Sequence, residues 1–385
     1  MPDASSDIVS VRIKEYYLSA TVGNKHMKIL VYHIGSLGDT LVAVPALWTV
    51  RENFPDAHIT MLTDEQPGQS LVQSQDVLDG SGLIDDYIVY SVGSLLAIAR
   101  LLLILRLRRF DTLIYLIRRE GDRQIQRDSV FFKLAGIKLR IGMAEFGSRS
   151  TYVIRDPMPE VPRVADSLLD RLRVVGLTPP PAGQGRVDIN IGERERANVE
   201  RWLSGLPDDG GSRWLAIGPG SNMPCKIWPL ERYLEVAKRL IDEYDLWPVV
   251  FGGAKDKDLG HRLLLEFGRG YVAAGVLGVR DSMAAMQRCL MFIGNDTGTM
   301  HMAAASGVRC VAVFTSRQEP GLWYPYGDGH VVLRTLVSCE GCLREECVEH
   351  KMKCILSISV EQVLQACRMV LDEQIGTTTC DLERF

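Results

Sequence analysis

The sequence has no excess of basic residues and no apolar run long enough to cross a bilayer. Its 44 lysines and arginines are outnumbered by 48 aspartates and glutamates, and the net charge of −4 argues against nucleic acid as the main partner. A secretory signal is also missing, because residues 1–26 contain charged side chains and no continuous apolar stretch. We therefore expect a cytoplasmic protein with no nucleic acid partner.

The most apolar stretch, residues 95–105, is too short to span a membrane. Its helical length, at about 1.5 Å per residue, covers about half of a hydrocarbon core. Arg106, Arg108 and Arg109 follow it, which leaves two interpretations open. It is either a helix that covers a sheet or an amphipathic segment on an anionic membrane surface. The two can hold together, so peripheral contact with the inner face of the cytoplasmic membrane is one expectation.

Cysteine is too sparse for a disulfide scaffold, with nine in 385 residues. Four of them nevertheless fall in one short segment: Cys339, Cys342, Cys347 and Cys354. Four neighbouring thiols in a cytoplasmic chain suggest a structural, tetrahedral zinc or iron site. The second pair lacks the usual two-residue spacing, so free thiols or a disulfide are the alternative. In neither case do these residues take part in catalysis.

The length of the chain predicts two domains. Apolar runs of strand length alternate with helical periodicity, first from Lys28 and again from Trp214, which predicts two doubly wound parallel sheets. The proline-rich residues 176–183 are interpreted as part of the connection. We predict an N-terminal extension, two Rossmann-like α/β domains facing across a cleft, and a C-terminal helix with a tail, at residues 1–26, 27–180, 181–358 and 359–385. Among the helices, we expect residues 40–53, 230–244, 281–290 and 360–371.

Residues 291–305 combine a buried strand, a tight turn and a helix. A helix that begins at the carboxyl end of a strand offers unpaired backbone N–H groups and the positive end of its dipole. Such a start is a binding site for a phosphate or diphosphate. The alternative is that Asp296 or Thr297 only caps the helix.

A second segment, residues 28–47, has the same design. Its turn carries Gly35 and Gly38, and Pro45 lies inside the helix that follows. The turn lacks the third glycine of the G-x-G-x-x-G fingerprint, which disfavours a dinucleotide site. A nicotinamide enzyme would also not need two comparable glycine turns in separate domains.

Three motifs, each at a strand end and in this order, carry a family resemblance. They are Lys28-Ile-Leu-Val with Gly38-Asp39 and Pro45-Ala-Leu47, Gly218-Pro-Gly-Ser221 with Lys226-Ile-Trp-Pro229, and Asp296-Thr-Gly-Thr-Met-His301. The chain resembles glycosyltransferase family 9, the lipopolysaccharide heptosyltransferase family. The resemblance implies a GT-B fold and inverting, metal-independent sugar transfer with no catalytic cofactor. It also implies ADP-heptose as the donor and a lipopolysaccharide-core or related glycan or glycolipid as the acceptor.

The resemblance makes Asp39 the catalytic base. A carboxylate at the tip of a glycine turn can take the proton of an acceptor hydroxyl while the oxygen attacks the anomeric carbon. Without the resemblance, Asp39 would be interpreted as the N-cap of a helix that starts at Thr40.

The resemblance also makes Lys226 the lysine that binds the donor diphosphate. A cation there offsets the charge that grows on the departing nucleotide. A lysine near a helix start otherwise opposes the helix dipole, so an anion beside it is favoured. The other donor-binding residues implied are Ser221, Asp296, Thr297, Gly298, Thr299 and His301, of which His301 is equally well explained as a packing histidine.

The nucleoside is expected near Gly253, Lys255 and Asp256. Heptosyltransferases of the family tend to have an acidic residue directly after the Gly-Ala of this segment, and Lys255 takes that position here. ADP as the carrier is therefore an expectation from the resemblance alone. Asp256 and Asp258 also spell the D-x-D of metal-dependent glycosyltransferases, but their place at a helix start favours capping, so we predict no catalytic metal.

Two other functions stay open at this point. The same fold can host a nucleotide-sugar epimerase or hydrolase, or a family 9 enzyme with another donor or acceptor. A catalytically silent sugar-nucleotide-binding protein is disfavoured, because both Asp39 and Lys226 are present. The acceptor is expected on N-terminal loops such as residues 118–127, which are basic.

Overall fold

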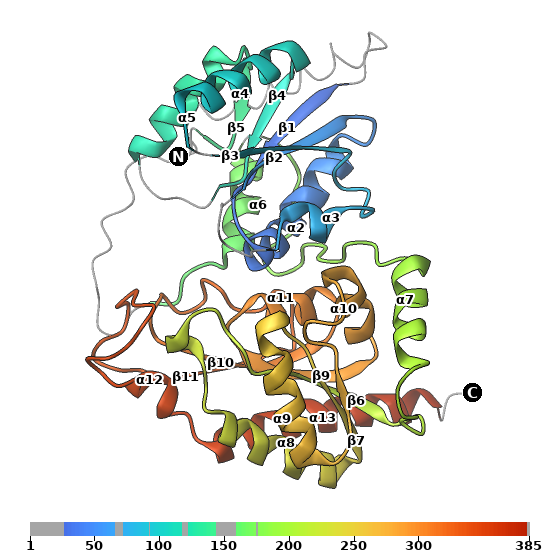
Figure 1. Cartoon of the computed structure of the whole chain (residues 1–385). Coiled ribbons are helices and arrows are strands. Elements are labelled where there is room, and N and C mark those ends of the chain that lie inside the picture. Colours follow the sequence, from blue (N-terminus) through green and yellow to red (C-terminus); the bar gives the residue numbers. More distant parts are fainter. Residues whose placement is uncertain are drawn as a thin grey trace. The chain divides into compact units, whose positions relative to one another are not determined.

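A computed structural model of the chain describes residues 27–65, 72–91, 93–117, 122–143, 159–174 and 176–382 (Figure 1). The chain divides into two compact units. The first unit comprises the described residues up to 143 together with residues 164–190, and the second comprises residues 159–163 and 191–382. The predicted N-terminal extension lies outside the described residues.

The first unit is built on a five-stranded parallel sheet with the order β3-β2-β1-β4-β5. Its strands are β1 (Lys28–Tyr32), β2 (His58–Glu65), β3 (Asp86–Ser91), β4 (Thr112–Tyr115) and β5 (Leu139–Ile141). Its helices are α2 (Leu37–Asn53), α3 (Ser74–Leu78), α4 (Leu95–Arg108), α5 (Asp122–Leu134) and α6 (Val164–Val174). Because β1 pairs with both β2 and β4, the strand order reverses beside β1.

The two faces of this sheet are covered by different helices. Leu30 and Tyr32 of β1 share a core with Leu101 and Leu105 of α4 and with Phe132 of α5. Figure 1 shows the strands between these two helices and the pair α2 and α3. All five residues of β1 except the first are buried, as expected of a central parallel strand.

The second unit is built on a six-stranded parallel sheet with the order β11-β10-β9-β6-β7-β8. Its strands are β6 (Arg213–Gly218), β7 (Leu246–Val250), β8 (Tyr271–Val272), β9 (Cys289–Asn295), β10 (Arg309–Phe314) and β11 (Val331–Arg334). Its α-helices are α7 (Glu193–Leu203), α8 (Leu230–Tyr244), α9 (Lys257–Phe267), α10 (Val279–Met286), α11 (Gly298–Ala305), α12 (Lys353–Leu356) and α13 (Val360–Leu382). Two 3₁₀ turns, η1 (Pro224–Lys226) and η2 (Ala254–Asp256), precede α8 and α9. Here the strand order reverses between β6 and β9.

The predicted helix 230–244 is confirmed, but the bounds of three other helices were wrong. Helix α2 begins at Leu37 rather than Thr40, because Ser36 and not Asp39 is its N-cap. Helix α10 begins at Val279 rather than 281, and it ends at Met286 rather than 290, since Cys289 already pairs with Trp214 of β6.

The last helix, α13, runs to Leu382 rather than ending at 371. Two contacts hold this extension against the second unit. The hydroxyl of Tyr244 donates to the carboxylate of Asp372 at 2.8 Å, and Arg309 forms an ion pair with Glu373.

The boundary between the compact units follows Asn190, rather than residue 180 as the composition suggested. The indole N–H of Trp48 donates to the carbonyl of Asp188 at 2.8 Å, and the guanidinium of Arg186 stacks 3.4 Å from the centroid of the same indole. The side-chain amide of Asn190 donates to the carbonyl of Ser81 at 2.6 Å. These contacts fasten the segment after the prolines to the first unit.

Within the described stretches, none of the helices has the length and apolar character that crossing a bilayer requires.

Candidate functional site

The candidate donor site lies at the carboxyl ends of β6 and β9, where the strand order of the second unit reverses. Ligands of doubly wound sheets bind at such a reversal, because the loops after the two strands diverge there. Gly218 and Gly294 lie opposite each other in the register of these strands. A Cβ atom on either glycine would come within 2.5 Å of the ring of Phe292, so this ring can pack against both strand ends only because both residues are glycine.

Two loops at this edge are joined by an ion pair between Lys226 and Asp296. The distance from Nζ of Lys226 in η1 to Oδ2 of Asp296 after β9 is 2.7 Å, and the two side chains are only 12% and 8% exposed. A buried pair of this kind holds the ammonium in one place while leaving it further donors for an anion. The structure therefore brings together the two charged residues that the motifs suggested.

Asn295 at the end of β9, which sequence reasoning missed, connects two loop segments and helix α8. It is fully buried, its Nδ2 donates to the carbonyl of Pro219 at 2.7 Å, and its Oδ1 accepts from the backbone N–H of Trp228 at 3.1 Å. The same oxygen accepts from the hydroxyl of Tyr233 at 2.8 Å. Asn295 thus positions the Gly-Pro-Gly turn and the segment after Lys226 against each other. The sequence feature that could have indicated this role is the position of Asn295, a polar amide between an apolar strand and Asp296.

Helix α11 begins at this edge without a side-chain cap. Thr297 precedes its first residue in extended conformation, and neither Thr297 nor Asp296 accepts a capping hydrogen bond. The alternative that these residues only cap the helix is therefore wrong. The hydroxyl of Thr297 is buried and has no hydrogen-bond partner in the part of the chain that the structure describes. This hydroxyl and the first amides of α11, those of Gly298 and Thr299, form a set of donors suited to an anion.

The remaining predicted donor residues have ordinary structural contacts. Ser221 is half-buried, and its hydroxyl accepts from the backbone N–H of Met223 at 3.1 Å, which shapes the approach to η1. His301 is 5% exposed, and its ring lies edge-on to that of Trp323, with centroids 6.2 Å apart. The packing interpretation of His301 is thus the one that the structure supports directly.

The segment predicted to lie near the nucleoside is organised by Asp256. Its Oδ2 accepts from the backbone N–H of Gly253 at 2.9 Å, which confirms a capping role. A Cβ on Gly220 or Gly252 would collide with the carboxylate, at 2.0 and 2.4 Å, so the side chain lies flat against both glycines. Burial raises the pKa of Asp256, against the opposing effects of the Gly253 hydrogen bond and the charge of Lys255.

In the first unit, Asp39 lies in the first turn of α2, directly after β1. Its Oδ2 accepts from the backbone N–H of Ser36 at 3.0 Å and from the Ser36 hydroxyl at 3.2 Å. The interpretation of Asp39 as the N-cap is wrong: it is the third helical residue and closes a capping box. Its second oxygen has no hydrogen bond within the described ranges. Asp39 can therefore stabilise its own turn and still offer a free oxygen to a substrate.

The glycine turn is required for this arrangement. Gly35 has a φ of +148°, and a Cβ atom there would lie 2.3 Å from the Cβ of Asp39. Gly38 is the second residue of α2, directly before Asp39.

His33, also missed by sequence reasoning, lies at the end of β1. It is 3% exposed, and its Nδ1 lies 3.3 Å from the carbonyl oxygen of Leu116, which follows β4. Its Nε2 is buried without a partner among the described residues. Burial lowers the pKa of His33, while the negative charges of Asp39 and Asp64 act in the opposite direction. The imidazole of His33 therefore lies within electrostatic reach of Asp39.

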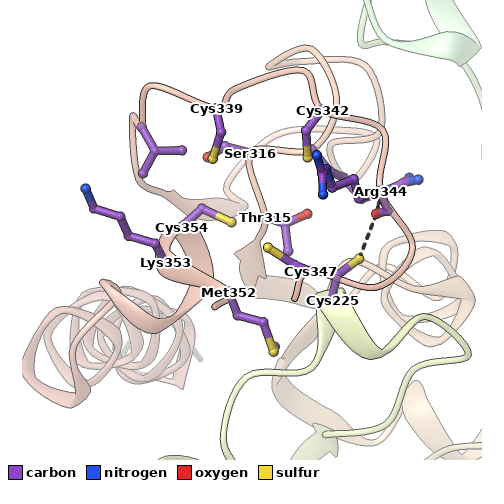
Figure 2. A pocket seen from close by; sticks show the side chains of 12 residues that line it. Cys225, Thr315, Ser316, Cys339, Cys342, Arg344, Cys347, Met352, Lys353 and Cys354 are labelled. Carbon is purple, nitrogen blue, oxygen red and sulfur yellow. Dashed lines mark hydrogen bonds between the residues drawn. The ribbon is translucent and has the colours of Figure 1, made fainter. Parts of the chain in front are cut away.

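The four clustered cysteines line one small pocket together with Cys225 of η1 (Figure 2). Burial, then the neighbouring thiols of Cys342 and Cys354, raise the pKa of Cys339. All four thiols are free, so the disulfide alternative is not seen. Within the described ranges, no three histidine, cysteine, aspartate or glutamate side chains are arranged to hold one metal ion.

The cysteine loop packs directly on the turn that carries Lys226. The backbone N–H of Cys225 donates to the carbonyl of Glu345 at 3.1 Å, and its thiol donates to the carbonyl of Arg344 at 3.1 Å. Arg317 also donates to the carbonyl of Arg344, at 2.8 Å. The cysteine loop therefore holds η1 in place through these hydrogen bonds, and this contact requires no metal.

Comparison with known proteins identifies the family of this chain. The model of glycosyltransferase family 9 (heptosyltransferase) matches residues 129–353, which is more than half of the chain. The chain belongs to glycosyltransferase family 9. The motifs that carried the resemblance thus identified the family correctly.

Relatives of this family 9 chain are known by sequence and by structure. It is 29% identical to lipopolysaccharide heptosyltransferase 2 of Escherichia coli (strain K12) over 164 residues, 41% of this chain and 46% of that protein. The chain spans about half the length of the curated relatives it matches.

Two solved structures resemble almost the whole chain. The crystal structure of a family 9 glycosyl transferase from Veillonella parvula DSM 2008 is 26% identical, with a TM-score of 0.71 and coverage of 91% of this chain and 99% of that one. The structure of the ADP-heptose lipopolysaccharide heptosyltransferase II of E. coli is 20% identical, with a TM-score of 0.65 and coverage of 90% and 99%. The predicted GT-B fold class, with two Rossmann-like sheets, is confirmed.

Proposed function

We propose that the chain is an inverting glycosyltransferase that moves a heptose from ADP-heptose to a hydroxyl of a lipopolysaccharide-core or related acceptor. The observation that carries the proposal is the buried ion pair between Lys226 and Asp296 at the strand reversal of the second unit. It supports the proposal because it fixes a cation beside unpaired donors at a helix start, which is the arrangement that a diphosphate needs. The heptose and its ADP carrier are taken from the names of the relatives.

In the proposed complex, the donor diphosphate lies over the start of α11. The hydroxyl of Thr297 and the amides of Gly298 and Thr299 donate to its oxygens, and the ammonium of Lys226 neutralises part of its charge. Ser221 and His301 complete the surroundings, and the nucleoside lies towards Gly253, Lys255 and Asp256. Asp296 holds Lys226 in place and remains near the sugar or ribose hydroxyls.

Asp39 is the proposed general base. Its free oxygen takes the proton of the acceptor hydroxyl, and the acceptor oxygen forms a bond to the anomeric carbon from the face opposite the diphosphate. The bond between the anomeric carbon and the diphosphate oxygen breaks, and its electron pair leaves with the nucleoside diphosphate. Attack opposite the leaving group inverts the anomeric centre. Lys226 stabilises the charge on the leaving group, so we propose that no catalytic metal is required.

We also propose that the four clustered cysteines hold a structural zinc or iron ion. The support for this is the chemistry of the four thiols that line one pocket, a donor set that such ions prefer. Such an ion would cross-link the loop that supports the Lys226 turn. Metal analysis of the purified protein tests this, and a protein that is metal-free when produced with zinc and iron would contradict it.

The proposed lipopolysaccharide-core acceptor includes a lipid part, which belongs in a membrane. We therefore propose a cytoplasmic protein that makes peripheral contact with the inner face of the membrane. The basic residues 118–127 are proposed to contact the acceptor; the first four of them lie outside the described residues.

A thermal-shift comparison of ADP, UDP, GDP and CDP tests the donor. Only the matching carrier raises the midpoint, by mass action. Transfer is then measured with ADP-heptose, with and without acceptor, in the presence of a chelator. Donor consumption that needs no acceptor would contradict transfer in favour of hydrolysis or epimerisation, and activity lost with the chelator and restored by a divalent ion would contradict metal independence.

A further inference from the structure

The outer face of α4 is apolar where a solvent-exposed helix is normally polar. Leu101 and Leu105 point into the core of the first unit, as a sheet-covering helix requires. On the opposite side, Leu96, Leu103 and Leu107 are 82%, 57% and 71% exposed. Their spacing of seven and four residues places them on one face of the helix. We call these three residues the leucine strip.

Arginines border the leucine strip on both sides. Arg100 and Arg106 are exposed and lie three residues before and after Leu103, so they project about 60° to either side of it at 3.6 residues per turn. No carboxylate of the described chain pairs with them, whereas Arg108 forms an ion pair with Asp86. With Arg109 at the C-cap, the helix and its cap carry four arginines and no acidic residue, in a chain whose net charge is −4.

Helix α8 of the second unit shows what a solvent-facing surface looks like in the same protein. Its exposed residues are all charged: Glu231, Glu235, Arg239, Asp242 and Glu243. The outer face of α4 differs in both respects, because its exposed centre is aliphatic and its charges have one sign. Helix α5, which covers the same side of the sheet, adds the exposed Val130, Lys133 and Leu134.

We propose that the outer face of α4 docks on an anionic bilayer surface, with the helix lying in the plane of the membrane. The leucine strip would enter the boundary between headgroups and acyl chains, and the arginine stems would extend along it while their guanidinium groups bind lipid phosphates. The helix is about 21 Å long at 1.5 Å per residue, too short to span a bilayer but sufficient for this arrangement. This proposal rests on the peripheral membrane contact proposed above and names the surface that makes it, and vesicle binding can fail while sugar transfer stands.

The charge pattern favours a lipid surface over a second copy of the chain. A symmetric contact through α4 would bring uncompensated arginines of two copies together, which like-charge repulsion opposes. The negative charge of an anionic membrane can neutralise the positive charges of all these arginines. Each basic residue near such a surface strengthens binding about fivefold.

Vesicle co-sedimentation of the full chain tests the proposal. We expect binding to phosphatidylcholine vesicles that contain phosphatidylglycerol, weaker binding at high salt, and little binding to phosphatidylcholine alone. The double variant R100Q/R106Q should bind about thirtyfold more weakly. The double variant L96E/L103E should lose at least about tenfold.

The matched control is L265E, because Leu265 of α9 is 84% exposed in the other unit. It should bind vesicles as the unaltered protein does. Unchanged thermal midpoints of all variants would show that binding is not lost through unfolding. If L96E/L103E unfolds, the binding of R100Q/R106Q tests the proposal by itself. Binding that is absent, indifferent to phosphatidylglycerol, or equal in all variants would overturn the proposal. The proposal would also be overturned if the unaltered protein did not bind vesicles but self-associated, and if L96E/L103E abolished that self-association.

Discussion

Asp39 and Asp296 both follow the carboxyl end of a central strand, yet their carboxylates are held in different ways. Asp39 accepts hydrogen bonds from Ser36, three residues away, within one turn of chain. Asp296 binds Lys226, which lies on a separate loop after a different strand. The first arrangement is local, and the second exists only once β6 and β9 are neighbours. A local site should tolerate changes elsewhere in the fold, whereas the second should fail when the loops around it move.

The largest effect is expected for Asp39→Asn, which keeps the shape of the side chain and removes its basicity. Transfer should fall about 10²- to 10⁴-fold, the usual contribution of a general base, while ADP still raises the thermal midpoint. The matched control is Asp76→Asn, because Asp76 accepts from the backbone N–H of Gln73 in the same kind of capping box at α3. Equal losses of activity in the two variants would indicate that Asp39 only caps its helix and is not the general base.

The next effect is expected for Lys226→Met. It removes the cation from the diphosphate and leaves the carboxylate of Asp296 buried without its partner. We expect transfer to fall about 10²- to 10³-fold, together with weaker binding of ADP by calorimetry. Lys238→Met is the control, since Lys238 is half-exposed and pairs with Glu266 on the surface. Full affinity for ADP in Lys226→Met would separate this lysine from the donor.

Asn295→Ala tests the dependence of the second site on its supporting loops. The substitution leaves the Trp228 amide, the Tyr233 hydroxyl and the Pro219 carbonyl without their partner. The free energy of unfolding should therefore fall by about 3 kcal/mol. The KM for the donor should rise more than kcat falls, because the variant disturbs positioning and not the base. Asn53→Ala removes one hydrogen bond on α2 as a control. A variant with normal donor KM at a temperature where it is folded would leave Asn295 a purely structural role.

The smallest effect concerns His33, whose buried imidazole lies within electrostatic reach of the local site. Its pKa in the folded protein is lower than in the unfolded chain, so the unfolded state binds more protons as the pH falls below about 6.5. The free energy of unfolding should therefore decrease as the pH falls through that range, by at most about 1.4 kcal/mol per pH unit. His33→Gln should remove this slope in urea titrations. An identical slope in both proteins would assign it to other groups.

Much of the fold could be predicted because its signals are short-range. Helix α8 was placed to the residue, since its apolar spacing and its flanking residues leave no ambiguity. The start of α2 was misplaced because Ser36 and Asp39 are both good caps, and only the geometry shows which of them is the N-cap. The end of α10 was misplaced because Leu290 continues a helical pattern but already belongs to β9.

By itself, the sequence determined the alternation of strands and helices, the glycine turn that presents Asp39, and the order of motifs that identifies the family. Each of these depends on residues a few positions apart, whose spacing is visible in the chain. Only the tertiary structure decided that Lys226 binds Asp296, that Asn295 joins two loop segments to α8, and that the leucine strip of α4 faces outward. These contacts depend on which strands become neighbours and which helix face packs on the sheet, and periodicity alone does not contain that information.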